Sequence, residues 1–472
     1  MHPTVGSMVR FMVRRERDGG FNAASRAILD VMATLRTGDV AASVNRNVMA
    51  GWINDALARQ PIVDLHTHCY APGFGCSPEP DGLLLWGIDE LVTYHYLVAE
   101  VFRVVPAAGR SGPTMPYEAF WRLSKAQQAD HIWQHLFIEH TPISEACRGV
   151  LTALGKLGLD PNERTLEPYR RWFADQDPNH YVDRVMQIAN VESITMTNPV
   201  FDDHERQVWL DKPAVGDDPR FEAVLRLDPL LRDWPGAAAR LTEWGYDVRE
   251  DRGGGTRDEV RRFLVDWIER MRAIYLAVSL PPDFCYPDAK NPAGDWFLDE
   301  CLLPVCAERG LPFAMMIGSQ RLVNRSLQDA GDMTGKADIR SVVNLCAAFA
   351  DNKFLVTMLA RENQHELCVA ARKFGNLMIF GCWWFVNNPS IVEEITRERF
   401  ELLGTSFIPQ HSDARILDQL LYKWEHSCGT IGRVMTDKFC DLAETGLDIT
   451  REQIDRDVAL LMRDNFRAFL QR

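Results

Sequence analysis

Two histidines lie two residues apart at the end of a short apolar run, where residues 61–68 read PIVDLHTH. Side chains alternate between the two faces of a strand, so His66 and His68 point to the same side. Two imidazoles on one side can bind one metal ion, and imidazole suits zinc and its neighbours among the transition metals. The alternative is a pair of surface histidines, but the apolar run before them favours a metal site.

A carboxylate and an arginine stand in a second segment, HSDAR, at residues 411–415. This segment follows the last predicted strand, which is the neighbour of the first strand in a closed barrel. Asp413 can therefore complete a metal site with His66 and His68, or act as a general base toward a metal-bound water or a substrate. Arg415 would anchor a substrate anion or keep Asp413 ionised. An ordinary surface ion pair is the alternative for this segment taken alone.

The elements that must position these side chains are short apolar runs separated by stretches with helical spacing. Several runs are continuously apolar, as expected for strands buried on both faces. Eight such strands predict an α/β fold, a (β/α)8 TIM barrel. A doubly wound open sheet is the alternative, but it would need a Gly-rich phosphate turn after its first strand. The predicted strands are Pro61–His66, Ser193–Thr197, Phe221–Leu225, Ile274–Ser279, Pro312–Ile317, Phe354–Leu359, Leu377–Phe380 and Gly404–Ile408.

The rest of the chain predicts one barrel with additions. We expect residues 46–472 to form a single metal-dependent barrel, preceded by an arm at residues 1–45 that is either mobile or the product of a start codon assigned too early. Residues 82–188 lie between the first and second predicted strands and have helical spacing, which predicts a helical cap insertion above the barrel mouth. A second insertion is expected at residues 235–270. Residues 451–470 should form a helix that packs on the barrel.

The composition is that of a globular protein with a small-molecule substrate. Hydrophobic residues make up 46% and charged residues 25% of the 472 residues, and the net charge is −14. An acidic chain repels nucleic acid and anionic membrane surfaces, so neither is expected as a partner. The 11 cysteines include no CxxC pair, which favours reduced thiols in a cytoplasmic protein over a disulfide framework. No apolar run is long enough to span a bilayer. The sequence leaves room for a homo-oligomer.

Five motifs, taken in order, resemble the uronate isomerase (glucuronate isomerase) family of the amidohydrolase superfamily. The resemblance spans nearly the whole chain, from about residue 53 to about residue 469. Each motif alone is weak, but five in the right order are specific. In chain order they are a His-Tyr pair at His95-Tyr96, an Arg-x-Asp at Arg226–Asp228, a Pro-Arg-Asp-Asn matched by Ala360-Arg361-Glu362-Asn363, a WWF at Trp383–Phe385 and an Asp-x-Arg at Asp413–Arg415.

The chain departs from the family pattern at several places, so the resemblance implies a divergent member. Met316 stands where the family has the His of a His-x-Gly motif at its fifth strand. A thioether cannot replace imidazole as a zinc ligand or acid–base group at neutral pH. Residues 280–282, LPP, replace an acidic-His pair, and residues 421–426, LYKWEH, replace an Arg-rich stretch. The substrate therefore need not be glucuronate or galacturonate.

The resemblance implies an aldose–ketose isomerase that acts on a hexuronate or related sugar acid through a cis-enediol intermediate. A divalent metal ion, zinc before others, would be the cofactor. A metal-dependent hydrolase or lyase that uses the same site on a small carboxylated substrate is the alternative, and an inactive barrel used for binding is a third hypothesis, which the retained HxH and Asp disfavour. The implied residues are His66, His68 and Asp413 for the metal, Asp413, Arg415, His95 and Tyr96 for catalysis, and Arg226, Arg361, Trp383 and Trp384 for the substrate.

Overall fold

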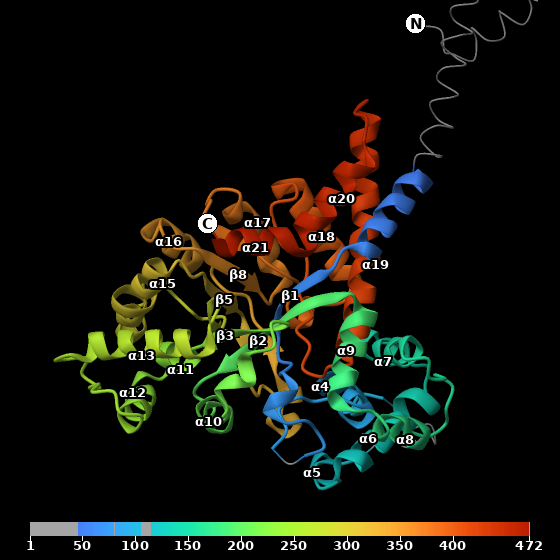
Figure 1. The fold of residues 1–472 in the computed structure, drawn as a ribbon, viewed down its shortest axis with the longest axis horizontal. Helices are drawn as coiled ribbons and strands as arrows, with labels where there is room; N and C mark the ends of the chain where they lie inside the picture. The colour runs from blue at the N-terminus through green and yellow to red at the C-terminus, as the bar shows by residue number, and fades with distance from the viewer. Residues whose placement is uncertain (1–45, 80, 105–114, 472) are drawn as a thin grey trace, which may run out of the picture.

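The computed structural model describes residues 46–79, 81–104 and 115–471, so the predicted arm at residues 1–45 lies outside the described residues. A curled sheet of seven parallel strands runs through the middle of the molecule (Figure 1). Its strand order is β1-β2-β3-β4-β5-β8-β9. The strands are β1 (Ile62–Thr67), β2 (Val191–Pro199), β3 (Phe221–Arg226), β4 (Leu276–Leu280), β5 (Phe313–Ile317), β8 (Phe354–Met358) and β9 (Leu377–Ile379).

Each of these strands overlaps one of the first seven predicted strands, which confirms those predictions. Several of the strands, such as β5, are apolar on both faces because each face packs into a core of its own. In β5, for example, Phe313 and Met315 belong to a large outer cluster, while Ala314 and Met316 belong to a smaller one. The smaller cluster also contains residues of β1 and β9, the two ends of the sheet, such as Leu65. One face of the sheet is therefore turned inward on itself.

The eighth predicted strand, Gly404–Ile408, does not form a regular strand, so this part of the prediction is wrong. Ile408 makes only an isolated parallel bridge, to Phe380 just after β9. The next residue is Pro409, which has no N–H to donate, so a ladder of hydrogen bonds cannot continue through it. Gly404 ends helix α18 (Pro389–Leu403) just upstream, which leaves little chain for a strand.

The chain nevertheless joins the two edges of the sheet through residues 408–414, which we call the connecting segment. On the β9 side, Gly381 N donates to Ile408 O at 2.9 Å. On the β1 side, Asp413 N donates to His66 O at 3.1 Å. The connecting segment therefore lies between β9 and β1 and is hydrogen-bonded to both.

The C-terminal residues are helical as predicted, and Phe466 and Phe469 are buried in the smaller of the two core clusters.

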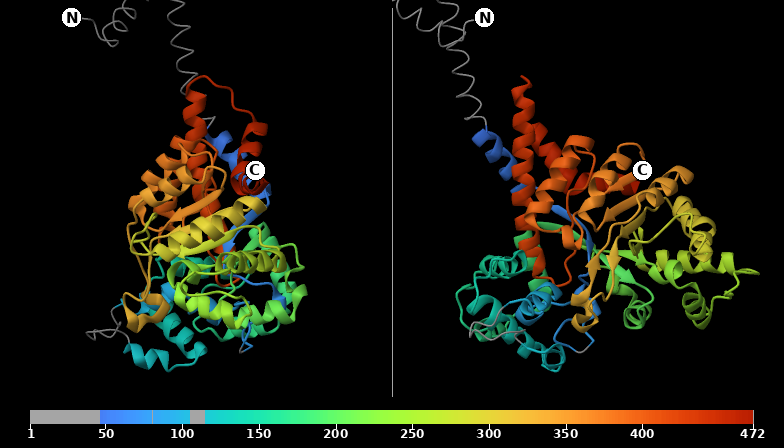
Figure 2. Two further views of the ribbon diagram at one scale, coloured as in Figure 1. Left: turned by 90° about the vertical axis from the view of Figure 1, so that its left-hand side faces the viewer. Right: turned by 180° about the vertical axis from the view of Figure 1, so that it is seen from behind.

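Helices cover the outer face of the sheet, and Figure 2 shows them around it from two further sides. After β2 the helices are α10 (Asp203–Asp211), α11 (Asp228–Arg232), α12 (Trp234–Glu243), α13 (Thr256–Met271), α14 (Pro292–Trp296), α15 (Leu303–Arg309), α16 (Arg340–Ala348), α17 (Gln364–Ala371), α18, α19 (Gln419–Glu444), α20 (Arg451–Ala459) and α21 (Asn465–Gln471).

Helices also occupy the chain between β1 and β2, and they form one group at the lower right of Figure 1. Helix α19 packs along two of them, α7 and α9. In α7 a Cβ at Gly149 would overlap the ring of Tyr422, so glycine is what permits this close approach. The role of residues 82–188 as a cap insertion stays a prediction. The helices are α3 (Ile88–Val92), α4 (His95–Val101), α5 (Tyr117–Trp121), α6 (Lys125–Trp133), α7 (Glu145–Lys156), α8 (Glu167–Ala174) and α9 (Pro178–Ala189).

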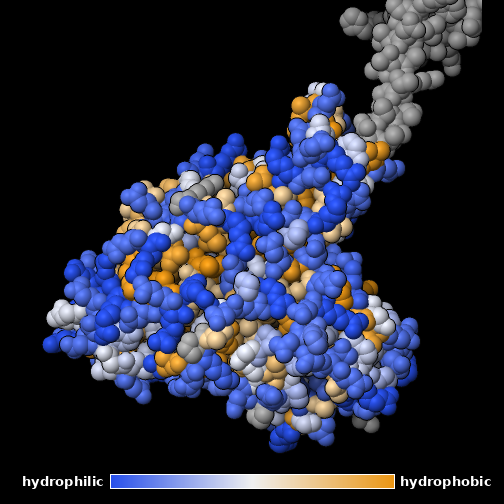
Figure 3. Space-filling model, viewed as in Figure 1, coloured by the Kyte–Doolittle hydropathy of each residue, from blue (hydrophilic) through white to orange (hydrophobic). Residues whose placement is uncertain are grey.

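The surface is mainly polar on the face that Figure 3 shows. The largest group of hydrophobic residues visible there lies over α15 and β5, and smaller ones are scattered over the rest of the face. Of the helices in the described residues, none combines the length and the apolar composition that a bilayer crossing requires.

A substitution at Gly381, which hydrogen-bonds to the connecting segment, tests how tightly that segment packs against its neighbours. The φ of Gly381 is +64°, and a Cβ there would overlap the ring of His411. We expect Gly381→Ala to lower the free energy of unfolding by at least about 1 kcal/mol, because a left-handed conformation alone costs an L-residue that much. Thermal denaturation measures the loss. Gly375→Ala is the control, since a Cβ at that position meets no atom within 4 Å. Equal small losses in both variants would contradict the prediction.

Candidate active site

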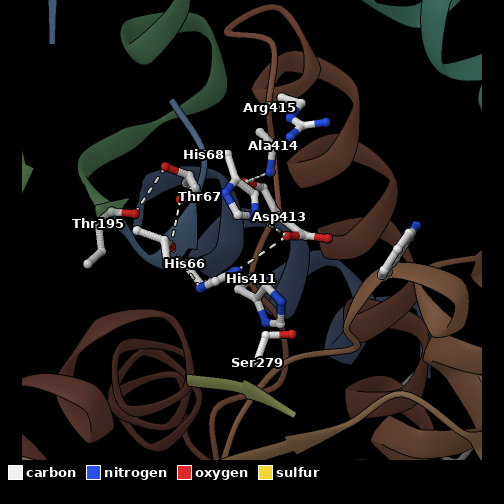
Figure 4. A network of polar contacts seen from close by, with 12 residues as sticks. His66, Thr67, His68, Thr195, Ser279, His411, Asp413, Ala414 and Arg415 are labelled. Carbon is white, nitrogen blue, oxygen red and sulfur yellow. Dashed lines mark hydrogen bonds and ion pairs between the residues drawn. The ribbon is translucent and has the colours of Figure 1, made fainter. Parts of the chain in front are cut away.

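Three side chains predicted as metal ligands come together at the carboxyl end of β1. His66 lies in β1, His68 lies just after it, and Asp413 belongs to the connecting segment. The Nε2 atoms of His66 and His68 each lie 3.4 Å from Oδ1 of Asp413. The three potential ligand atoms lie within 4.8 Å of one another. Figure 4 shows both rings directed toward the Asp413 carboxylate, so the structure forms a candidate metal site.

The hydrogen bonds around His66 leave the lone pair of Nε2 free for a metal ion. Thr197 Oγ1 donates its only proton to Thr67 O at 2.8 Å and lies 3.1 Å from Nδ1 of His66. Nδ1 must therefore carry the proton and donate to Thr197, as metal-binding histidines commonly do toward an outer partner. His66 Nε2 and Asp413 Oδ1 are buried, and neither hydrogen-bonds within the part of the chain that the structure describes. Such orphaned atoms are rare unless something else binds them.

The protonation states also fit a divalent ion. Burial lowers the pKa of His68 to about 4, so its ring is neutral. Burial works against the charge of Asp413, but the adjacent His66 and His68 rings outweigh it and hold the pKa of its carboxyl well below the usual range. A neutral imidazole and an ionised carboxylate are the forms that bind a metal. The residues present therefore fit the ion that the sequence predicts.

Asp413 has a strained backbone, with a φ of +50°. This left-handed conformation costs a residue other than glycine roughly 1–2 kcal/mol. Helix α19 holds it in place through Lys423, which is 6% exposed and donates from Nζ to Ser412 O at 2.6 Å and to Asp413 O at 3.2 Å. Hydrogen bonds to a charged group contribute about 1.5–3 kcal/mol each, so these two bonds can offset the strain.

Asp64 holds the same segment from β1. Its buried carboxylate accepts hydrogen bonds from Ser412 N at 3.0 Å and from Trp424 Nε1 at 2.9 Å, while burial raises its pKa. Sequence reasoning gave no role to Asp64, Lys423 or Trp424. Two signals could have found them. Asp64 is the only charged residue in the apolar run at residues 61–65, and Lys423 lies between two aromatic residues, Tyr422 and Trp424, as the only charged residue on the buried face of its helix.

A cavity of about 580 Å³ adjoins the three candidate ligands. It brings together eight of the ten residues that the sequence predicts for the site, from both halves of the chain. Tyr96 and Arg361 are the two that do not line it. The eight are His66, His68, His95, Arg226, Trp383, Trp384, Asp413 and Arg415.

His95 and Tyr96 both begin helix α4 but line different spaces. His95 lines the large cavity, and its Nε2 accepts a hydrogen bond from Trp384 Nε1 at 3.0 Å. Burial lowers the pKa of His95 to about 3. The neutral ring therefore carries its proton on Nδ1, which can donate. Tyr96 lines an adjacent cavity of about 200 Å³, and its buried hydroxyl has no hydrogen-bond partner among the described residues.

Arg226, at the end of β3, lines the cavity while bound to a neighbouring carboxylate. Its Nε and Nη2 donate to Asp228 at 2.5 and 3.3 Å. Asp228 in turn accepts a hydrogen bond from Ser279 N at 2.7 Å. A guanidinium has five N–H donors, so Arg226 can keep this contact and bind a second carboxylate.

The other two predicted arginines lie in different surroundings. Arg415 lines the cavity with a side chain that is 48% exposed, and its Nη1 lies 3.5 Å from Oδ2 of Asp329. Arg361 lies outside the cavity, where its exposed guanidinium forms a salt bridge with Glu394 at 2.9 Å. The structure thus brings Arg415, but not Arg361, to the candidate metal ligands.

The loop after β5 supplies a cavity residue that sequence reasoning missed. A small hairpin, β6 (Ser319–Gln320) and β7 (Met333–Thr334), frames this loop. Arg321 lines the cavity, with its guanidinium 5.4 Å from the centre of the Trp384 ring, and pairs with Asp332 at 2.5 Å. No signal in the sequence marks this arginine, because its loop has no regular spacing.

Comparison with solved structures identifies the family. A uronate isomerase from Bacillus halodurans C-125 is 52% identical to this chain, and the match covers 90% of this chain and 97% of that one, with a TM-score of 0.84. The chain belongs to the uronate isomerase family. The family predicted from the five motifs is thereby confirmed, and Met316, which departs from the family pattern, lines the cavity of this uronate isomerase family member.

Two more distant structures share the fold. A uronate isomerase from Thermotoga maritima is 16% identical over 89% of this chain and 97% of that one, with a TM-score of 0.63. A glucuronate isomerase from Caulobacter crescentus is 12% identical over 90% and 94%, with a TM-score of 0.68. No protein-family profile matches the chain, and no curated protein sequence matches it.

The site predicts that this uronate isomerase family member binds about one transition-metal ion per chain. His66→Ala/His68→Ala should lose the ion and keep a folded protein, because two of the three ligands are removed. Elemental analysis of protein made without a chelating tag measures the ion. His180→Ala, which removes an exposed ring, should keep it. Wild-type protein with almost no zinc, manganese, iron, cobalt or nickel would contradict the prediction.

Proposed function

We propose that the chain is an aldose–ketose isomerase that converts hexuronates or related sugar acids through a cis-enediol intermediate. The observation that carries the proposal is a single cavity in which the His66, His68 and Asp413 ligand set lies with a neutral His95 and cationic side chains. Membership of the uronate isomerase family supports the same reaction.

We further propose that the curled sheet is a (β/α)8 barrel in which the connecting segment takes the place of the eighth strand. Its hydrogen bonds to both edge strands support this view. Active sites of such barrels lie at the carboxyl ends of the strands, which is where β1 carries His66. The helices between β1 and β2 would then form the predicted cap, residues 82–188, from which His95 reaches the cavity.

Zinc is the proposed metal. Two imidazoles and one carboxylate, with a position left open for substrate, are typical of catalytic zinc sites. When bound, the ion polarises the substrate's carbonyl and hydroxyl oxygens and stabilises negative charge on them.

A cytoplasmic location is proposed as well. The 11 cysteines are all free in the structure. Free thiols persist in a reducing compartment, which supports the location that the sequence predicts.

Asp413 is the proposed base of the isomerisation. It would remove the proton at C2 of the aldose, and the electrons of that bond would form the C1–C2 double bond while the C1 oxygen gains a proton. Asp413 would then return its proton to C1 as the C2 hydroxyl loses one, which yields the ketose. A carboxylate is a weak base for a proton on carbon, so donors must stabilise the enediolate oxygens.

His95 and Arg415 are the proposed donors to those oxygens. His95 can donate from Nδ1, since Trp384 occupies its other ring nitrogen. Arg415 brings a permanent positive charge to the same cavity. Tyr96, predicted for the same role, lines the adjacent cavity, so the proposal gives the donor role first to His95 and Arg415.

Arg226 is the proposed binding group for the substrate carboxylate. Its pairing with Asp228 fixes the plane of the guanidinium, and a fixed planar fork suits a carboxylate better than a point charge does. Trp383 and Trp384 line the same cavity and would pack against the sugar.

A metal-dependent hydrolase or lyase is not favoured, because the solved structure that is 52% identical to this chain is named a uronate isomerase. The two classes differ in whether solvent oxygen enters the product. The test is turnover in H₂¹⁸O. A product that carries ¹⁸O in a newly formed C–O bond would favour hydrolysis, whereas an isomerase incorporates no ¹⁸O except through exchange of the carbonyl oxygen with water.

The base role predicts the behaviour of Asp413→Asn. This change keeps the shape of the side chain and removes the base, so turnover should fall by at least about 10²-fold. NMR in D₂O, with a panel of hexuronates, measures both turnover and exchange of the C2 proton, and the variant should lose both. Elemental analysis shows whether the variant still holds its metal ion. If a metal-loaded variant lost turnover but kept native exchange, Asp413 would be a ligand only and His95 would be the next candidate base.

The carboxylate role predicts that Arg226→Lys raises KM although the charge is kept, because an ammonium cannot bind Asp228 and the substrate with the same planar geometry. We expect kcat to fall as well if the clamp positions C2. Arg249→Lys is the matched control, since Arg249 pairs with Asp251 at the same spacing on the surface. An unchanged kcat/KM for Arg226→Lys would assign Arg226 to a structural ion pair.

A further inference from the structure

The contacts of helix α19 with the connecting segment fall outside the reaction described above. Lys423 and Trp424 are adjacent in α19, and both are buried. Lys423 binds the two carbonyl groups on either side of the Asp413 Cα, at Ser412 O and Asp413 O. Trp424 binds Asp64, which in turn accepts the Ser412 N–H. One turn of helix therefore contacts two carbonyl groups of a single strained stretch directly, and the Ser412 N–H of that stretch through Asp64.

We propose that Lys423 is a positioning residue whose ammonium group sets the backbone of Asp413 so that its carboxylate faces His66 and His68. This inference rests on the proposed function in one respect, which is the reaction in which the Asp413 carboxylate takes part. Lys423 is not among the residues that line the large cavity, so it acts through Asp413 and not on the substrate.

The geometry gives the reason. The carbonyls of Ser412 and Asp413 are separated by the two backbone dihedrals of Asp413, so one donor bound to both fixes those dihedrals. An ammonium has three N–H donors on one atom and can bind both carbonyls at once. The φ of +50° at Asp413 is the conformation that this pair of bonds holds. A neutral side chain of the same length would leave two buried carbonyls without this donor.

The charges around Lys423 support the same role. Burial lowers the pKa of the Lys423 ammonium group, and the buried carboxylates of Asp413 and Asp64 act in the opposite direction because they attract its positive charge. A small molecule can reach the position of Lys423 from one side, because Lys423 lines the adjacent cavity of about 200 Å³. Truncation of the side chain would join the space that it leaves to this cavity, through which a small amine can enter.

The first test uses Lys423→Met, which keeps the length and the packing of the side chain and removes both hydrogen bonds. We expect zinc affinity, measured by competition with a chromogenic chelator, to fall about 10–100-fold, the range for residues that orient metal ligands. We also expect kcat to fall by a similar factor with little change in KM. The zinc titration is independent of which sugar acid is the substrate.

The second test is chemical rescue of Lys423→Ala. Propylammonium replaces the missing atoms and should restore zinc affinity and kcat in a saturable manner. Propanol has the same length but one O–H donor, which cannot bind two carbonyls at once, so it should not restore either. Lys353→Ala is the matched control, because Lys353 also donates to a backbone carbonyl, at Leu470, but lies at the amino end of β8, whereas His66 lies at the carboxyl end of the parallel strand β1. It should keep native zinc affinity and show no rescue.

Native zinc affinity and native kcat in Lys423→Met would overturn the proposal. So would equal rescue of Lys423→Ala by propanol and propylammonium, or failure of both variants to fold with and without the amine, since each result would assign Lys423 to packing or stability alone. If the wild-type protein binds zinc but turns over no hexuronate, the proposed function fails while the zinc titrations still decide the role of Lys423.

Discussion

The backbone conformation of Asp413 is the constraint on which the site depends. Its carboxylate can meet His66 and His68 only because the chain leaves regular strand geometry between β9 and β1 and turns through a φ of +50°. Such a conformation is unfavourable in isolation. It persists because the surrounding structure fixes it from both sides, through the backbone bond to His66 O and through Lys423. Strain that is held this way is typical of functional sites.

Burial decides the charge of the groups around that residue. The histidines are surrounded by protein, so burial lowers the pKa of His68, His95 and His411 and keeps them neutral. Asp413 stays ionised beside them. Neutral imidazoles and an ionised carboxylate leave net negative charge in a low-dielectric interior, which is costly unless a cation compensates it. A bound metal ion would supply that compensation next to the carboxylate of Asp413.

Most of the fold could be predicted from the sequence because its signals are local. Seven strands could be predicted from short β-branched or apolar runs, several of which are continuously apolar, as strands buried on both faces are. The eighth failed because Gly404–Ile408 has the composition of a strand, while Pro409 prevents the ladder from continuing. Tyr96 and Arg361 show the same limit at the site. Their motifs match the family in order, but order along the chain does not say which cavity a side chain lines or whether it pairs with Glu394 at the surface.

The family, the seven strands of the sheet and the three candidate metal ligands all follow from the sequence. They do so because the alternation of a strand places His66 and His68 on one side, and because the order of the motifs survives without any knowledge of contacts. The three-dimensional packing is needed to see how Asp413 is held, that Lys423 and Asp64 bind the segment around it, and that Arg321 reaches the cavity. Some of those contacts join residues far apart in the chain, such as Asp64 and Trp424, which are 360 positions apart. Others, such as that of Lys423 with Asp413, join residues only 10 positions apart, but no periodic pattern records either kind. They depend on how the helices and the connecting segment pack, which is a property of the whole fold.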